Sequence, residues 1–277
     1  MLDGSDLVYA YDGSFEGLMC CVFESYQCKE IPSIIRPPSV QQTLFDTSKR
    51  IETDEHKADR VYNSIPMKIS SDAQELVKLG FLTCVQHKEL LILHFLRLGF
   101  KYGGKVMTML TDDVVCSLQK AVRHLTFESH KFKGFVRFSI YEEVLVAVIE
   151  PKNYVLPLLS PHFCDRYNGE RFMIYDKTHN MALIYQSQNA ELIFVDELTL
   201  PEVEDSELEY RRLWKQFYKT IAIKGRNNPR CRMTLMPKRY WSQMPEFSEK
   251  DVPYESNQVA QWCLAETRVE TLSKYPT

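Results

Sequence analysis

The stretch that decides the fold reads Phe135-Val136-Arg137-Phe138-Ser139-Ile140-Tyr141-Glu142-Glu143-Val144-Leu145-Val146-Ala147-Val148-Ile149. Both ends of this stretch are rich in β-branched and aromatic residues, and Tyr141-Glu142-Glu143 separates them as a turn. The sequence therefore predicts a hairpin of two strands, 135–140 and 144–149. On an alternating strand, Arg137 would project from the face opposite Val136 and Phe138.

After this hairpin the pattern alternates between helix and strand. A helix is expected from about Asn153 to Arg166, followed by a second pair of strands at 171–175 and 181–185. The turn between these strands is Asp176-Lys177-Thr178-His179-Asn180. The sheet is therefore expected to be antiparallel.

The N-terminal half is mainly helical in pattern. An apolar run at 7–11 predicts a strand, Asp12-Gly13-Ser14 predicts a turn that caps a helix, and 15–26 has apolar residues at helical spacing. Helical periodicity continues in 55–65, 72–83, 87–101 and 112–128.

The expected fold class is α+β, with a helical middle region packed with an antiparallel sheet of short hairpins and a helical C-terminal region. We expect one domain over residues 1–250, helix-rich in 1–130 and sheet-containing in 131–250, and a peripheral tail at 251–277.

Composition and charge limit the classes of function. The chain has 277 residues, of which 44% are hydrophobic and 26% charged, so it is a folded globular protein rather than a disordered one. Its formal net charge is -3, so any contact with nucleic acid requires a local basic surface. The apolar run Leu90–Phe100 is too short to span a membrane, and His94 within it is interpreted as a hydrogen-bonded core residue. The first residues do not form a secretory signal, which predicts a cytoplasmic protein.

The most informative local feature is a basic and aromatic segment from Lys224 to Arg239, extended by Tyr240 and Trp241, with no acidic residue in 224–239. Guanidinium and ammonium groups bind phosphate, and exposed aromatic rings stack on unpaired bases. The predicted nucleic-acid-binding residues are Arg226, Asn228, Arg230, Arg232, Lys238, Arg239, Tyr240, Trp241 and, from the first hairpin, Arg137. A structural role is equally open, with the arginines paired to the acidic stretch 196–209 and Trp241 in the core.

A second group of residues combines the side chains used in acid–base chemistry. His162 and Arg166 are four residues apart, which places them on one face of the expected helix, and Asp176 follows in the next turn. His130 lies before the first hairpin. The catalytic candidates are His162, Arg166, Asp176 and His130, and a purely structural network of the same residues is the alternative.

Seven acidic residues and no basic one lie between Asp196 and Glu209, directly before an aromatic helix pattern. This combination leaves a protein-docking surface over 196–218 as a further alternative. The chain has no GxxxxGK[ST], GxGxxG, GxSxG or HExxH motif and no CxxC pair. We therefore expect no cofactor and no metal ion in this protein.

Several motifs together resemble one bacterial family. They are the run Tyr11–Leu18, the pattern His130-x-Phe132-x-Gly134-Phe135-Val136-Arg137-Phe138, the pair His162-Phe163 with Arg166, and the segment Arg226–Trp241. The family is a domain-of-unknown-function family labelled as DNA-metabolism or DNA-repair proteins, and the resemblance covers about Leu7 to Glu246.

The resemblance implies a DNA context for this chain. Members of the family are typically encoded beside a radical S-adenosylmethionine (radical-SAM) protein, and some are fused to a uracil-DNA glycosylase-like domain. The expected function is that of a DNA-binding accessory protein in repair or modification. It would bind single-stranded or distorted DNA and act with a radical-SAM partner. Two alternatives stay open: an enzyme acting directly on a nucleobase or phosphodiester, and a docking adaptor without nucleic-acid contact.

Overall fold

The computed structural model describes residues 7–38, 48–141, 143–195, 198 and 205–247. The chain forms two compact units, residues 1–125 (unit 1) and residues 126–277 (unit 2). The division falls within helix α5 (Asp113–Phe135), close to residue 130, where the sequence predicts the change from helix-rich to sheet-containing structure. A single domain over 1–250 stays a prediction, and the tail 251–277 lies outside the described residues.

Unit 1 contains a small parallel sheet. Strand β1 (Val8–Ala10) lies between β2 (Ile34–Arg36) and β3 (Ser48–Arg50) and pairs with both in parallel. The turn after β1 is built as predicted, because Gly13 has a φ of 83° and Ser14 accepts a hydrogen bond from the Gly17 N–H at 2.9 Å. The expected strand at 7–11 and helix at 15–26 are confirmed.

The rest of unit 1 is helical, as the periodicity predicts. The helices are α1 (Phe15–Gln27), α2 (Glu55–Lys68), α3 (Ser71–Phe81), α4 (Lys88–Tyr102), the 3-10 helix η1 (Gly103–Thr108) and the first part of α5. Asp54 and Ser70 cap α2 and α3 by accepting backbone hydrogen bonds. The fully buried side chains from α1, α2 and α4 include Leu18, Met19, Ile65, Ile92, Leu93, Phe95 and Leu96.

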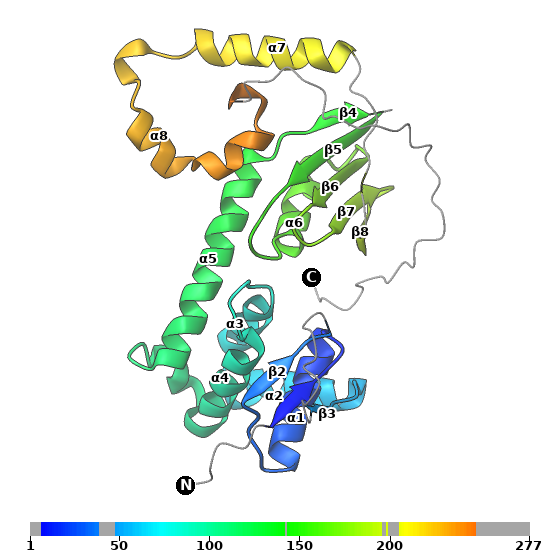
Figure 1. The fold of residues 1–277 in the computed structure, drawn as a ribbon, viewed down its shortest axis with the longest axis vertical. Helices are drawn as coiled ribbons and strands as arrows, with labels where there is room; N and C mark the ends of the chain where they lie inside the picture. Colours follow the sequence, from blue (N-terminus) through cyan, green and yellow to red (C-terminus); the bar gives the residue numbers. More distant parts are fainter. Residues whose placement is uncertain (1–6, 39–47, 142, 196–197, 199–204, 248–277) are drawn as a thin grey trace. The chain divides into compact units, whose positions relative to one another are not determined.

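Unit 2 is organised around a five-stranded sheet of order β4-β5-β6-β7-β8 (Figure 1). The strands are β4 (Ser139–Tyr141), β5 (Val144–Ile149), β6 (Phe172–Asp176), β7 (Met181–Gln186) and β8 (Asn189–Phe194). Helix α6 (Leu156–Arg166) covers one face of the sheet and contributes Phe163 to an aromatic cluster with Phe138, Tyr167 and Phe172. The structure confirms the α+β class.

The expectation of an antiparallel sheet is wrong for one pair of neighbouring strands. β5 and β6 pair in parallel, with Ile149 beside Asp176, whereas the other neighbouring strands are antiparallel. The reason is that helix α6 connects β5 to β6, and such a crossover returns the chain to the same end of the sheet. The carboxyl ends of β5 and β6 therefore lie next to each other.

The first predicted strand begins later than expected. Phe135 is the last residue of α5, and the Val136 N–H still donates to the Phe132 carbonyl at 3.0 Å. Phe132 and Phe135 both pack against the Tyr240 ring, so helical spacing is retained to the end of α5. Of the predicted strand 135–140, only Ser139 and Ile140 join the sheet, and β4 continues to Tyr141, which was expected in the turn.

Residues 205–247 of unit 2 are mainly helical, as predicted for the C-terminal region. They contain α7 (Asp205–Thr220), η2 (Lys224–Arg226), α8 (Pro229–Leu235), η3 (Lys238–Gln243) and η4 (Pro245–Phe247). Of the helices in the described ranges, none has the length and apolar character needed to cross a membrane.

Candidate functional site

The basic and aromatic segment spans η2, α8 and η3, and its side chains fall into two groups. Arg226, Arg230 and Lys238 are exposed, and none of these three is in an ion pair with any residue that the structure describes. Asn228 has a structural role as the N-cap of α8, where its Oδ1 accepts from the Cys231 N–H at 3.0 Å. The exposed cations, which we call the α8 cation group (Arg226, Arg230, Lys238), are the part of the segment available to phosphate.

The remaining members of the segment are held by contacts with other residues of unit 2. Trp241 stacks on Phe247 with 4.6 Å between ring centroids, and its Nε1 donates to the Met236 carbonyl at 3.0 Å. The Arg232 guanidinium lies 5.4 Å from the centroids of both rings. One face of Trp241 is therefore already occupied, which leaves less ring surface for a base than the sequence suggests.

Arg239 and Tyr240 are held by helix α5. Arg239 Nη2 lies 2.7 Å from Glu128 Oε1 and also donates to the Tyr240 hydroxyl. Tyr240 is buried, and its ring meets Phe132 edge-on at 5.1 Å. These two residues join η3 to α5. The structural alternative therefore applies to Arg239, but its acidic partner is Glu128 and not a residue of the predicted stretch 196–209.

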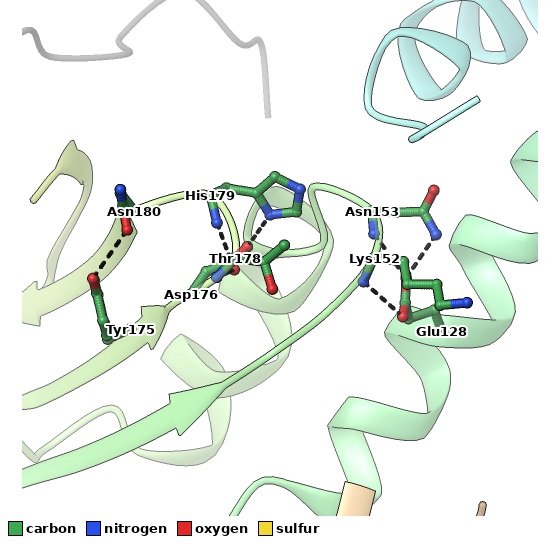
Figure 2. Close-up of polar contacts among 8 residues, drawn as sticks. All are labelled: Glu128, Lys152, Asn153, Tyr175, Asp176, Thr178, His179 and Asn180. Carbon is green, nitrogen blue, oxygen red and sulfur yellow. Dashed lines mark hydrogen bonds and ion pairs between the residues drawn. The ribbon is translucent and has the colours of Figure 1, made fainter. Parts of the chain in front are cut away.

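Glu128 is the centre of this junction and is almost completely buried. Its carboxylate accepts hydrogen bonds from the Lys152 N–H at 3.0 Å, the Asn153 N–H at 2.9 Å and Asn153 Nδ2 at 2.6 Å (Figure 2). Burial by itself raises the pKa of this carboxyl. The hydrogen bonds from Lys152 and Asn153, together with the Arg239 charge, outweigh burial and hold the pKa below its usual value. Glu128 is therefore an ionised structural anchor.

Arg137 does not lie on a strand, so the expected projection from the sheet is wrong. Its Nη1 donates to the Gly134 and Val136 carbonyls at 2.9 and 3.2 Å, and its Nη2 lies 2.9 Å from Glu246 Oε1. The guanidinium is 5.9 Å from the Trp214 ring centroid. The side chain folds back over the end of α5 because these carbonyls have no helical partner there.

The structure does not bring the catalytic candidates together as one group. His130 is exposed on α5, Arg166 is exposed above the Tyr167 ring, and His162 is half-buried on α6. Within the described part of the chain, no hydrogen bond or ion pair connects any two of His130, His162, Arg166 and Asp176. The His162 Nε2 atom is buried without a hydrogen-bond partner among the described residues.

Asp176 instead pairs with a histidine that sequence reasoning treated only as part of a turn. The carboxylate is fully buried at the end of β6, and its Oδ2 lies 2.6 Å from His179 Nδ1 (Figure 2). Its Oδ1 accepts from the Thr178 and His179 N–H groups at 2.9 and 3.2 Å. The Tyr154 ring, from the loop after β5, stacks on the His179 ring with 3.9 Å between centroids.

In the Asp176–His179 pair, the carboxylate holds the imidazole ring in one orientation. If Nδ1–H donates to the carboxylate, the opposite ring nitrogen is left as an acceptor or a general base, as in many hydrolytic sites. The pair lies at the adjoining carboxyl ends of β5 and β6, the one parallel pair among the described strands of this sheet. The carboxyl ends of parallel strands are a common place for ligands to bind. The sequence does contain a signal for this pair, which is its spacing, because the side chain of an Asp that starts a turn can reach a His three residues later.

The same arrangement also has a structural role, because Asp176 satisfies two backbone donors of the β6–β7 turn. Over the ranges that the structure describes, no group of three or more His, Cys, Asp or Glu side chains is placed to hold a metal ion.

Comparisons with known proteins identify a family for this chain. No curated protein matches this chain. A similar solved structure is that of the pGpG-specific phosphodiesterase PggH from Vibrio cholerae, which is 9% identical. The match covers 70% of this chain and 83% of that chain with a TM-score of 0.31, which supports no conclusion about this protein.

A family model, described as a domain of unknown function (DUF4130), matches residues 86–246. This is more than half of the 277 residues, and it includes the α8 cation group, the Glu128 junction and the Asp176–His179 pair. The prediction of a domain-of-unknown-function family is confirmed, although the model begins well after Leu7, where the resemblance starts. The chain therefore belongs to the DUF4130 family of domains of unknown function.

Proposed function

We propose that this protein is a DNA-associated accessory protein in DNA repair or modification, and that the α8 cation group contacts the phosphate backbone. The observation that carries the proposal is the exposure of Arg226, Arg230 and Lys238 on one short segment without ion-pair partners among the described residues. Cations without an ion pair gain most from phosphate, because no counter-ion has to be displaced. The Lys238 ammonium lies 5.9 Å from the Trp241 ring centroid, a contact that leaves its charge unpaired. The net charge of -3 makes such a local group necessary.

The preferred DNA form is single-stranded or distorted. Tyr240 and Trp241 are engaged in packing, but Ile223, Met233 and Leu235 are exposed beside the cations, at 59%, 38% and 69%. Apolar side chains contact bases well only where the bases are unstacked. The chemistry would then be supplied by a radical-SAM partner, which is what the resemblance to the family implies.

The direct test is binding of the purified protein to labelled single-stranded and duplex DNA over a series of salt concentrations. Affinity that falls steeply with salt, with single strands bound more tightly, supports the proposal. Absence of binding at low salt contradicts it and moves the function to the partner protein.

A second candidate function is that of an enzyme acting on a nucleobase or phosphodiester. The observation that favours it is the 2.6 Å contact between His179 and the buried Asp176. A single-turnover assay on single-stranded and damaged DNA would test it with His179→Ala and His162→Ala. Loss of product by about a hundredfold in His179→Ala, with DNA binding retained, supports the enzyme. No product from the wild-type protein on any substrate supports the accessory role.

A docking adaptor without DNA contact is favoured by one feature of α7. Tyr210, Leu213 and Phe217 lie on one helix face and are 65%, 54% and 52% exposed. Residues 196–197 and 199–204 of the acidic segment lie outside the described residues. Co-purification with the neighbouring radical-SAM protein that survives nuclease treatment and is lost in Leu213→Glu supports the adaptor, provided that DNA binding is absent.

A further inference from the structure

Unit 1 contains a hollow of about 660 Å³ that none of the predicted functional residues lines. Its volume lies within the range of small-molecule sites, which is roughly 300–1,000 Å³. The wall is formed by the end of α1, one face of α4 and the start of α5. The side chains that matter here are Tyr26, His94, Arg97, Phe100, Lys101 and Asp112.

Helix α4 supplies the polar side of the hollow. His94, Arg97 and Lys101 are separated by three and four residues, so they share one face of an otherwise apolar helix. The opposite face contains Ile92 and Phe95, which are fully buried. His94 therefore lies half-buried on the wall of the hollow and not in the core, where the sequence analysis placed it.

Arg97 is held in place but has no counter-ion among the described residues. Its Nη1 donates to Ser25 Oγ at 2.9 Å, and Ser25 is itself fully buried and donates to the Glu30 carbonyl. The guanidinium lies 4.9 Å from the Tyr26 ring centroid. A half-buried cation with fixed geometry and free donors is suited to an anion, because the cost of ordering the side chain is already met.

An aromatic wall lies beside these cations. Tyr26 is 42% exposed and meets the Phe100 ring edge-on, with 5.8 Å between centroids. Burial and the neighbouring Arg97 charge lower the pKa of His94, so its imidazole is a neutral hydrogen-bonding group at neutral pH. Asp112 Oδ1 accepts from the Val114 and Val115 N–H groups at 2.9 and 3.2 Å, which fixes an acceptor at the rim.

From this combination we propose that the hollow binds a phosphate monoester joined to a flat ring, that is, a nucleoside monophosphate or the 5′-phosphorylated end of a nucleic-acid strand. Arg97 and Lys101 hold the phosphate, Tyr26 stacks on the base, and Asp112 accepts a hydrogen bond from a sugar hydroxyl or a base amino group. The site lies in unit 1 and is separate from the α8 cation group, so it goes beyond the proposed function and does not depend on it.

The test is isothermal titration of the full-length protein with thymidine 5′-monophosphate, thymidine and inorganic phosphate as probes. We expect the nucleotide to bind at least about tenfold more tightly than either fragment, because only the nucleotide engages cations and ring together. Arg97→Gln should weaken nucleotide binding by about tenfold or more. Arg60→Gln is the matched control: it removes an exposed arginine that also lies over an aromatic ring, Phe23, but does not line the hollow.

Three further measurements complete the test. If Arg97→Gln does not fold by circular dichroism, the exposed Lys101→Gln is measured in its place. A 5′-phosphorylated dinucleotide that binds more tightly than the mononucleotide identifies the ligand as a strand end, and the reverse identifies a free nucleotide. Arg226→Ala with Arg230→Ala should leave nucleotide affinity unchanged. Equal nucleotide binding by the Arg97 and Arg60 variants, or no binding of the nucleotide by the wild-type protein at about 1 mM, overturns the proposal.

Discussion

Arg239 Nη2 lies 2.7 Å from Oε1 of Glu128, and the Glu128 side chain is only 3% exposed. Removing the charge of Glu128 takes the partner from Arg239 and places an amide against backbone donors. We expect Glu128→Gln to lower the free energy of unfolding by about 3 kcal/mol, measured by urea denaturation. Glu150→Gln, which loses only the surface contact to Lys177, should cost less than about 0.5 kcal/mol. Equal effects of the two substitutions would show that the junction is not an anchor.

The Glu128 junction also predicts how stability depends on acid. The folded-state pKa of this carboxyl lies below its unfolded value of 4.5, so the folded protein binds the proton less readily. Its contribution is fully present above the unfolded pKa and is lost as the pH falls through the folded pKa. Wild-type protein should therefore lose more free energy of unfolding than Glu128→Gln when the pH falls below about 4.5. Parallel acid profiles for the two proteins would contradict this assignment.

The α8 cation group predicts a specific change in DNA binding. Arg226→Ala with Arg230→Ala should weaken binding and reduce the slope of log affinity against log salt by about 2, because two phosphate contacts are lost. Filter binding or fluorescence anisotropy measures both quantities. Arg166→Ala with Arg171→Ala removes two other exposed arginines of unit 2 and should leave the slope unchanged. The same slope in both double variants would remove the α8 cation group from the interface.

Trp241 is expected to contribute to folding and not to base stacking. Trp241→Ala removes the contacts with Phe247 and Arg232, and we expect a loss of about 2 kcal/mol in the free energy of unfolding. DNA affinity should stay within about twofold of the wild-type value. Tyr210→Ala, at a ring that is 65% exposed, is the control for stability. A stable Trp241→Ala protein with impaired DNA binding would reverse this assignment.

Asp176 holds the β6–β7 turn whatever its role in chemistry. Asp176→Ala leaves the Thr178 and His179 N–H groups without their acceptor, and we expect a loss of about 2 kcal/mol. Thr178→Ala keeps the backbone donor and has an exposed side chain, so it should cost less than about 0.5 kcal/mol. Urea denaturation of the two variants distinguishes a turn-forming carboxylate from a free one.

Local features of the sequence determined most of the elements. Ser14, Asp54 and Ser70 each accept a backbone hydrogen bond at the start of a helix, as capping residues do, and the periodicity of 87–101 matches α4. The β-branched run at 144–149 is β5. These signals act between residues a few positions apart, which is why they can be read from one sequence and why the α+β class is confirmed.

Only the tertiary structure decided which partners the side chains have. Glu128 and Arg239 are 111 residues apart, and neither local spacing nor composition indicates that they meet. The same applies to the parallel pairing of β5 with β6 and to Tyr154 over His179. A basic segment specifies an excess of cations, but packing determines which of them are neutralised inside the fold. The sequence by itself therefore determined the elements and the cation-rich segment. The tertiary structure decided that Arg239 is paired with Glu128 and that Arg232 lies against Trp241 and Phe247, and it left Arg226, Arg230 and Lys238 exposed without an ion pair among the described residues.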